Sequence, residues 1–196
     1  TNIIVDPRDH DVVWAGIEVD GIYKSLDGGD SWVRLPDLGP DAFHGDIHGM
    51  ALSVGQPRSI YATTPYGIAT STDEGESWDY HEFPKYDESE KWSYCRGMLV
   101  KADDPNVIFV GSGDTMQGVT GDIRLTKDGG KTWGTAGLPQ EPNSRIYWFA
   151  NHPSIPHVVA AASIYGYVYV SEDGGDTWEK LRKEFGEIRT LALMPN

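Results

Sequence analysis

An eight-residue pattern that occurs four times constrains this chain more than any other feature. It reads [Ser/Thr]-x-Asp-x-Gly-x-[Ser/Thr]-Trp, and its copies begin at Ser25, Ser71, Thr126 and Ser171. Successive copies start 46, 55 and 45 residues apart. A repeat of this length is typical of propellers and solenoids, in which each repeat is one supersecondary unit. Four copies in register therefore indicate a repeat protein.

Each copy has the chemistry of a hairpin turn. A short apolar run of the strand type precedes it, and a short polar run follows it. The aspartate can accept backbone N–H groups, the glycine supplies a backbone angle that other residues resist, and the tryptophan is large enough to anchor the hairpin. We therefore assign these side chains a structural role rather than a catalytic one: Asp27, Asp73, Asp128, Asp173, Trp32, Trp78, Trp133 and Trp178.

The four patterns resemble the Asp-box, or BNR, repeat of sialidase-like β-propellers. Similar boxes occur in sialidases, xyloglucanase-type glycoside hydrolases, sortilin-type receptors and photosystem assembly factors, and the resemblance is strongest to bacterial BNR-repeat, glycosyl-hydrolase-like proteins. It covers essentially the whole chain and implies an all-β propeller of four-stranded blades. It does not by itself imply catalysis, because function lies in sites that differ between proteins of one fold.

A proline turn gives the repeat a second marker, and it places the blade boundaries. Pro7 and Pro195 occupy the same repeat position 188 residues apart, which corresponds to four units averaging 47 residues. The chain then holds four complete blades and the first, inner strand of a fifth, which we expect to be part of a ring of about six to eight blades. The rest of the protein or a second chain would supply the missing blades; a closed ring of four blades is the alternative. The expected blades are about 1–43, 44–92, 93–143 and 144–183, with the first strand of a further blade at about 186–194.

Composition narrows the choice of partners. The formal charge of −14 argues against a nucleic-acid backbone or an anionic membrane surface, since both require a basic face. A carbohydrate or a protein partner is compatible with it. Cys95 stands alone and leaves the compartment open. His44, Asp46 and His48 have the spacing of some metal sites, but no further ligand accompanies them, so we expect neither a metal nor a cofactor.

Polar residues recur at equivalent positions near the start of the inner strands. Because strand side chains alternate between faces, these residues would gather around one channel mouth, while Ile47, Cys95, Ile146 and Ile188 would pack between blades. The alternative is that the polar groups pair with one another and only fill the channel. The ligand-binding residues predicted on this basis are His48, Tyr94, Arg96, Arg145, Tyr147 and Arg189.

The three arginines resemble the arginine triad with which sialidases hold a carboxylate, a task suited to a planar fork. The Phe/Tyr-Arg-Ile-Pro motif expected near a sialidase N-terminus is absent from this sequence. A glycosidase of another kind would need two carboxylates across the sugar. Asp46, Glu187 and Asp114 are the candidates for an acid or base. A long Gly-rich segment, 111–121, could act as a lid.

Two functions follow from these observations. The first is a sialidase-like or glycosyl-hydrolase-like propeller that binds or cleaves carbohydrate at the channel mouth, and the sequence leaves open whether it is an enzyme. The second is a non-catalytic propeller that serves as a protein-binding or assembly scaffold. Paired carboxylates over an aromatic cleft would favour the first function, and a broad apolar patch would favour the second.

Overall fold

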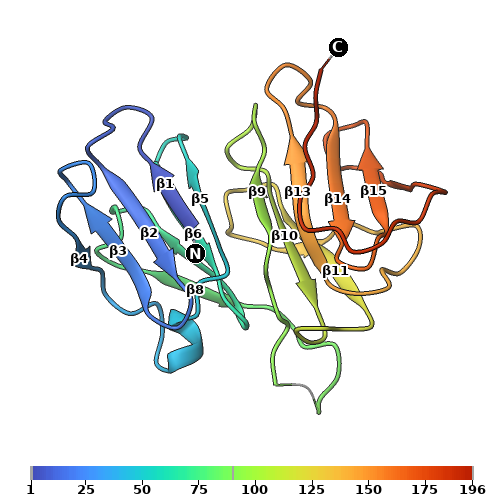
Figure 1. Cartoon of the computed structure of the whole chain (residues 1–196), viewed down its shortest axis with the longest axis horizontal. Helices are drawn as coiled ribbons and strands as arrows, with labels where there is room; N and C mark the ends of the chain where they lie inside the picture. The colour runs from blue at the N-terminus through green and yellow to red at the C-terminus, as the bar shows by residue number, and fades with distance from the viewer. Residues whose placement is uncertain (1, 90, 196) are drawn as a thin grey trace. The chain divides into compact units, whose positions relative to one another are not determined.

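The computed structural model describes residues 2–89 and 91–195 (Figure 1). Its regular structure in these residues consists of β-strands and one short 3-10 turn, η1 (Ala42–Gly45). The chain divides into two compact units, Thr1–Phe83 and Pro84–Asn196. Within the described residues, no helix is long and apolar enough to cross a membrane.

The first unit contains two antiparallel four-stranded sheets, each with its strands in sequence order. The first sheet comprises β1 (Asn2–Val5), β2 (Val13–Ile17), β3 (Gly21–Ser25) and β4 (Val33–Arg34). The second sheet comprises β5 (Gly49–Ser53), β6 (Ser59–Thr63), β7 (Gly67–Ser71) and β8 (Asp79–Glu82).

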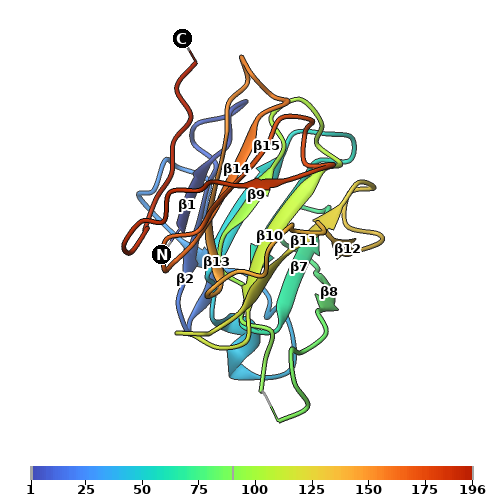
Figure 2. The ribbon, with the colours of Figure 1, turned by 90° about the vertical axis from the view of Figure 1, so that its right-hand side faces the viewer.

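The second unit repeats this arrangement. Its first sheet comprises β9 (Met98–Val100), β10 (Ile108–Gly113), β11 (Gly121–Thr126) and β12 (Gly134–Thr135), and Figure 2 shows β12 beside β11. Its second sheet comprises β13 (Ile146–Asn151), β14 (Val159–Ser163), β15 (Val168–Ser171) and β16 (Glu179–Lys180). Four up-and-down strands per repeat form the blade of a propeller, so the chain is an all-β propeller protein.

Each unit has an apolar core to which both of its sheets contribute. In the first unit Trp14 and Ile22 from one sheet pack with Ile60 and Ala69 from the other. In the second unit the ring of Phe109 lies 6.0 Å from that of Trp178, edge to face. The second strand of each sheet is almost wholly buried, which explains its run of Val, Ile, Ala and aromatic residues.

The box turns join the third and fourth strands of every sheet. In the last box, the Asp173 carboxylate accepts the backbone N–H of Thr177 at 2.9 Å and its hydroxyl at 2.6 Å. The Ser171 hydroxyl accepts the N–H of Gly175 at 2.7 Å. The other three boxes repeat these contacts with Asp27, Asp73 and Asp128. These hydrogen bonds satisfy backbone donors that the turn would otherwise leave without partners.

The inner strands differ from expectation at their first residues. The expected strand residues Asp46 to His48 precede β5, and Tyr94 to Gly97 precede β9. Isolated backbone bonds continue the pairing there, such as that from Arg96 N–H to the Gly111 carbonyl at 2.9 Å. In the described residues after Lys180 no strand is assigned, although Ile188 N–H donates to the Ile164 carbonyl at 2.9 Å. The further blade at about 186–194 stays a prediction.

Candidate functional site: an arginine–tyrosine cluster

Tyr147 is at the centre of a cluster of arginines in the second unit. In the ladder between β13 and β14, Ile146 pairs with Ser163 and Trp148 pairs with Ala162, so Tyr147 is an extra residue in the strand. Such a bulge bends a strand locally and changes the direction of a side chain, and bulges are common beside functional sites. The Tyr147 side chain is half-buried, and the neighbouring Trp148 is 42% exposed.

Three guanidinium groups lie against the Tyr147 ring. The Cζ atoms of Arg145, Arg189 and Arg96 are 5.3, 5.6 and 5.8 Å from the ring centroid. Each distance is in the range of a cation–π contact. Glu187 forms an ion pair with Arg189. The cluster therefore gathers three positive charges and one negative charge in a protein whose overall charge is −14.

The three arginines are graded in depth. Arg189 is exposed, Arg96 is half-buried, and Arg145 is only 6% exposed. Arg145 also lies 5.5 Å from the ring centroid of Tyr94. The cluster therefore presents guanidinium groups from the protein surface to its interior.

Tyr94 has a strained backbone. Its φ of 23° falls in a region that non-glycine residues rarely adopt. Strain of this kind is retained only where the surrounding structure enforces it, and it is frequent at binding sites. The buried Tyr94 ring contacts Arg145 and, edge to face at 6.1 Å, Trp92. The strain therefore accompanies the placement of an aromatic ring against the buried arginine.

Glycines bring neighbouring backbones into direct contact around the cluster. A Cβ at Gly97 would lie 2.4 Å from the carbonyl oxygen of Tyr147, and one at Gly113 would lie 2.3 Å from the Cβ of Arg145. The segment 111–121 thus packs on the backbone of Arg145, with Gly121 close to the Arg145 Cα. The role of this segment as a lid stays a prediction.

The cluster changes the acidity of its own groups. Burial would raise the pKa of Tyr147, but the polar contact with Arg189 and the charge of Arg96 outweigh burial and lower it below its usual value. Burial lowers the pKa of Arg145, and the like charge of Arg96 acts in the same direction. An arginine nevertheless remains protonated at neutral pH. The cluster is consequently cationic under physiological conditions.

The remaining predicted site residues have other surroundings. His48 and Asp46 lie in the first unit, where His48 Nε2 is 3.3 Å from Asp46 Oδ2. Asp114 accepts the backbone N–H of Val119 at 3.0 Å, which closes the 111–121 loop upon itself. Glu187 faces Arg189. In the described residues, no group of three His, Cys, Asp or Glu side chains has a geometry suited to a metal ion.

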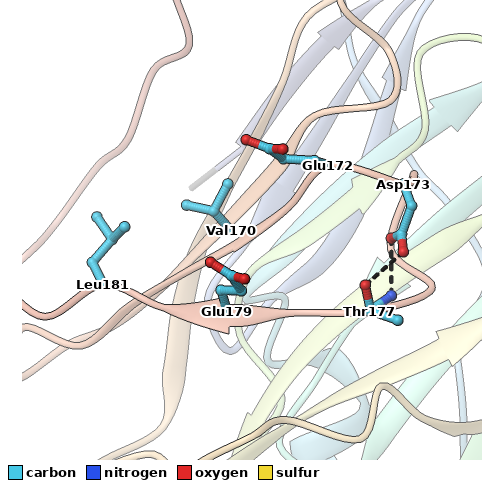
Figure 3. Close-up of a pocket in the computed structure, with 6 residues that line it drawn as sticks. All are labelled: Val170, Glu172, Asp173, Thr177, Glu179 and Leu181. Atoms are coloured by element: carbon cyan, nitrogen blue, oxygen red, sulfur yellow. Dashed lines mark hydrogen bonds between the residues drawn. The ribbon is translucent and has the colours of Figure 1, made fainter.

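A pocket at the outer edge of the last sheet did not emerge from the sequence. It encloses about 350 Å³, and Figure 3 shows Glu172 and Glu179 beside Val170 and Leu181. Asp173 also lines the pocket, and its carboxylate accepts the backbone N–H of Thr177 in the box turn. Glu172 occupies a variable position of the box, so the repeat pattern carried no signal that would single it out.

The fold and its box turns define an Asp-box β-propeller. The family model of Sortilin-Vps10 (sortilin, neurotensin receptor 3) matches residues 68–191. This match covers more than half of the 196 residues, and the chain belongs to that family.

Individual relatives include both enzymes and a peptide-binding protein. The oligoxyloglucan-reducing end-specific xyloglucanase of Emericella nidulans is 25% identical over 91% of this chain. An ancestral GH74 enzyme superposes with a TM-score of 0.72 at 22% identity over 90% of this chain, and YCF48 bound to D1 peptide with 0.57 at 21% over 99%. The chain spans 23% of the xyloglucanase, 23% of the GH74 enzyme and 60% of YCF48. It is thus a glycosyl-hydrolase-like propeller.

Proposed function

We propose that this propeller binds carbohydrate at the arginine–tyrosine cluster, with Trp148 as the surface on which a sugar ring stacks. The observation that carries the proposal is the placement of an exposed tryptophan next to the bulged Tyr147 and its arginines. A flat apolar face beside a few fixed polar donors is the usual composition of a small-molecule site. The sequence relationship to a xyloglucanase supports carbohydrate as the ligand class.

We propose that the cluster binds carbohydrate, and we assign no catalytic role to its residues. Glu187 pairs with Arg189, and Asp114 is used to close its own loop. A glycosidase needs one carboxyl group that can donate a proton and a second that acts as base or nucleophile across the sugar. The cluster instead contains tyrosines and arginines, which are groups that orient a ligand. Ligand binding is therefore the function that its chemistry supports best.

The proposal is tested by titrating the protein with oligosaccharides while following tryptophan fluorescence. Trp148→Ala should weaken binding at least tenfold, since base- or ring-stacking on an aromatic side chain contributes about 1–3 kcal/mol. Trp32, which is 40% exposed in the first unit, provides a control of matched exposure. Trp32→Ala should leave saccharide affinity unchanged. Equal losses in both variants would contradict the assignment of the site.

A protein partner is the second candidate function. It is favoured by the similarity to YCF48, whose structure contains a bound D1 peptide. On this alternative the cluster would hold a peptide and Trp148 would contact one of its side chains. A peptide array would test this function. A peptide that binds the wild-type protein but not Arg145→Met, together with no saccharide binding, would support it instead of the first.

A further inference from the structure

An exposed leucine marks the pocket on the last sheet. In every sheet, the residue after the fourth strand donates its backbone N–H to a carbonyl at or next to the start of the third strand: Leu35 to Ile22, Phe83 to Tyr66, Ala136 to Ile123 and Leu181 to Val168. These four residues are therefore equivalent. Leu35, Phe83 and Ala136 are buried, whereas Leu181 is 40% exposed. The last sheet thus leaves open a position that is covered in the other three sheets.

A box turn covers this position in the first unit. A Cβ at Gly75, the fifth residue of the second box, would lie 2.4 Å from Cδ1 of Leu35. A glycine there lets the backbone of the turn pack directly on the leucine. Beside it, Lys24 in β3 forms an ion pair of 2.8 Å with Glu74, the fourth residue of the same box. The second sheet thus docks its box on the first sheet through one glycine and one ion pair.

The second unit docks its sheets in the same way. A Cβ at Gly175, the fifth residue of the fourth box, would lie 2.4 Å from Cζ of Phe109 in β10. Lys127, the second residue of the third box, forms an ion pair with Asp176, the sixth residue of the fourth box. In both units, then, a lysine on the receiving sheet meets an acidic residue of the incoming box.

The pocket face of the last sheet has the opposite charge. Four residues that line the pocket form this face: Val170, Glu172, Glu179 and Leu181. Glu172 is the second residue of its box, the position that Lys127 has in the third box. Val170 precedes its box as Lys24 precedes the first box, and it pairs across the ladder with Glu179. Acidic and apolar side chains thus take the places that lysines have on the receiving sheets of the two units.

Both carboxylates of the pocket face are available to a partner. In Figure 3 the carboxylates of Glu172 and Glu179 lie on either side of Val170. Within residues 2–89 and 91–195 neither forms an ion pair, and the adjacent Lys180 pairs with Glu184 instead. Two carboxylates beside apolar side chains attract a basic residue and repel an acidic one.

We propose that the pocket face receives the box turn of a further Asp-box blade, one with Lys or Arg as the sixth residue of its box. The glycine at the fifth position of that box packs on Leu181, as Gly75 packs on Leu35, and the basic residue pairs with Glu172. Three boxes of this chain have an acidic sixth residue: Asp30, Glu76 and Asp176. A second copy that offered its first box would bring Asp30 against Glu172, and like charges at an interface are unfavourable. The pocket face shares no residue with the arginine–tyrosine cluster, so its occupant does not depend on the proposed carbohydrate function.

The third box supplies a probe, since its sixth residue is Lys131. Residues 124–135 contain this box, and Arg124 and Thr135 face one another in the ladder. A disulfide between cysteines added at the two ends therefore closes this segment into a cyclic peptide. NMR titration of the whole chain with the peptide should shift the backbone amide signals of the pocket face. A peptide with Lys131→Glu should bind about fivefold more weakly, because an attraction is replaced by a repulsion of similar size.

Charge reversal on the protein is the decisive variant. Glu172→Lys should bind the Lys131→Glu peptide about fivefold more tightly than the unchanged peptide, which inverts the wild-type order of affinities. Glu88→Lys changes an exposed carboxylate of the same unit outside the pocket face and should keep the wild-type order. The wild-type order in Glu172→Lys, or the absence of amide shifts in the pocket face with both peptides, would overturn the proposal.

A second variant tests the apolar part of the surface and the alternative occupant. Leu181→Ser changes an exposed residue that follows β16, so it should fold normally and bind the basic peptide a few-fold more weakly. Unchanged affinity would contradict the packing of the box glycine on Leu181. A wild-type dimer in light scattering that Leu181→Ser dissociates would make a second copy the occupant and contradict the basic box.

Discussion

Arg58 in the first unit and Arg145 in the second have similar burial and aromatic neighbours but different charged partners. Each is largely buried and lies against aromatic rings, Arg58 at 5.6 Å from Trp14 and Arg145 at 5.3 Å from Tyr147. Arg58 has two carboxylates, with its Nη2 atom 2.9 Å from Glu74 Oε1 and its Nη1 atom paired with Asp6. Arg145 has none among the described residues. The charge of the first arginine is compensated within its own unit, whereas the second arginine is a buried cation without a carboxylate partner among the described residues.

Asp6 shows how thoroughly the first charge is compensated. Burial alone would raise the pKa of Asp6, but the backbone N–H of Arg8 and the guanidinium of Arg58 outweigh it and lower the pKa. Glu74, in the second box, is the other carboxylate that pairs with Arg58, and its backbone φ is 64°. The other three boxes have glycine at this position: Gly28, Gly129 and Gly174. The first unit therefore tolerates backbone strain in order to place a carboxylate beside Arg58.

The largest expected effect comes from removing the buried partner of Arg58. Asp6→Ala leaves a mostly buried guanidinium with only the exposed Glu74, and should lower the free energy of unfolding by about 3 kcal/mol. Urea denaturation followed by circular dichroism measures this change. A loss below about 0.5 kcal/mol is typical of an exposed ion pair. It would contradict the view that Asp6 compensates a buried charge on Arg58.

The matching change in the second unit should have the opposite sign. Arg145→Met replaces an uncompensated buried cation by an apolar side chain of similar length, so the ligand-free protein should gain about 1 kcal/mol of unfolding free energy. The same urea experiment applies. If Arg145→Met destabilises the ligand-free protein as Asp6→Ala does, then Arg145 is a structural residue and the two arginines do not differ in kind.

Acid should weaken the box turns of both units without distinguishing them. Hydrogen bonds from the box hydroxyl and backbone donors lower the pKa of Asp27, Asp73 and Asp128 to about 2, and lower that of Asp173 as well. Carboxyls with a folded-state pKa below the unfolded value of about 4 stabilise the fold above that pH. This stability should be lost as the pH falls from about 4 to about 2.

Thermal melts between pH 5 and pH 2 measure the effect. Asp73→Asn and Asp128→Asn are a matched pair, one in each unit, and each should lower the melting temperature at pH 7 and reduce the further loss between pH 4 and pH 2. A wild-type melting temperature that stays constant over this range would contradict the stabilising role of the box carboxylates.

The smallest expected effect is at Glu74. Glu74→Gly relieves the strained φ but removes the contacts to Lys24 and Arg58, which are 2.8 and 2.9 Å long. The two contributions are each of the order of 1 kcal/mol and oppose one another, so the net change in unfolding free energy should stay within about 0.5 kcal/mol. Asp6→Ala combined with Glu74→Gly should then be more destabilising than the sum of the single changes. Simple additivity would mean that the two carboxylates do not share Arg58.

The sequence predicts the fold better than it predicts the site, for a physical reason. Four copies of the box define turns whose contacts are local, so the order of strands and the number of sheets follow from spacing alone. The gathering of Tyr94, Arg96, Arg145, Tyr147 and Arg189 also follows, because equivalent positions in repeated units lie near one another. All five belong to the second unit, whereas His48 lies in the first.

What the sequence does not contain is the detail that makes the cluster unusual. Three such details depend on non-local packing: the bulge at Tyr147, the positive φ of Tyr94, and the lack of a carboxylate beside Arg145 among the described residues. The expected inner strands begin too early at Asp46 to His48 and at Tyr94 to Gly97, since these residues precede β5 and β9, although Ile47 and Cys95 are buried as predicted. A segment that precedes a strand and continues its pairing through isolated hydrogen bonds has the same pattern of apolar residues as the strand itself. The sequence therefore cannot show where the strand begins.

The most direct test of the central claim is the thermal midpoint of three ligand-free proteins: the wild type, Asp6→Ala and Arg145→Met. The account predicts that Arg145→Met melts above the wild-type protein and that Asp6→Ala melts below it. Midpoints below that of the wild-type protein for both variants would contradict the account.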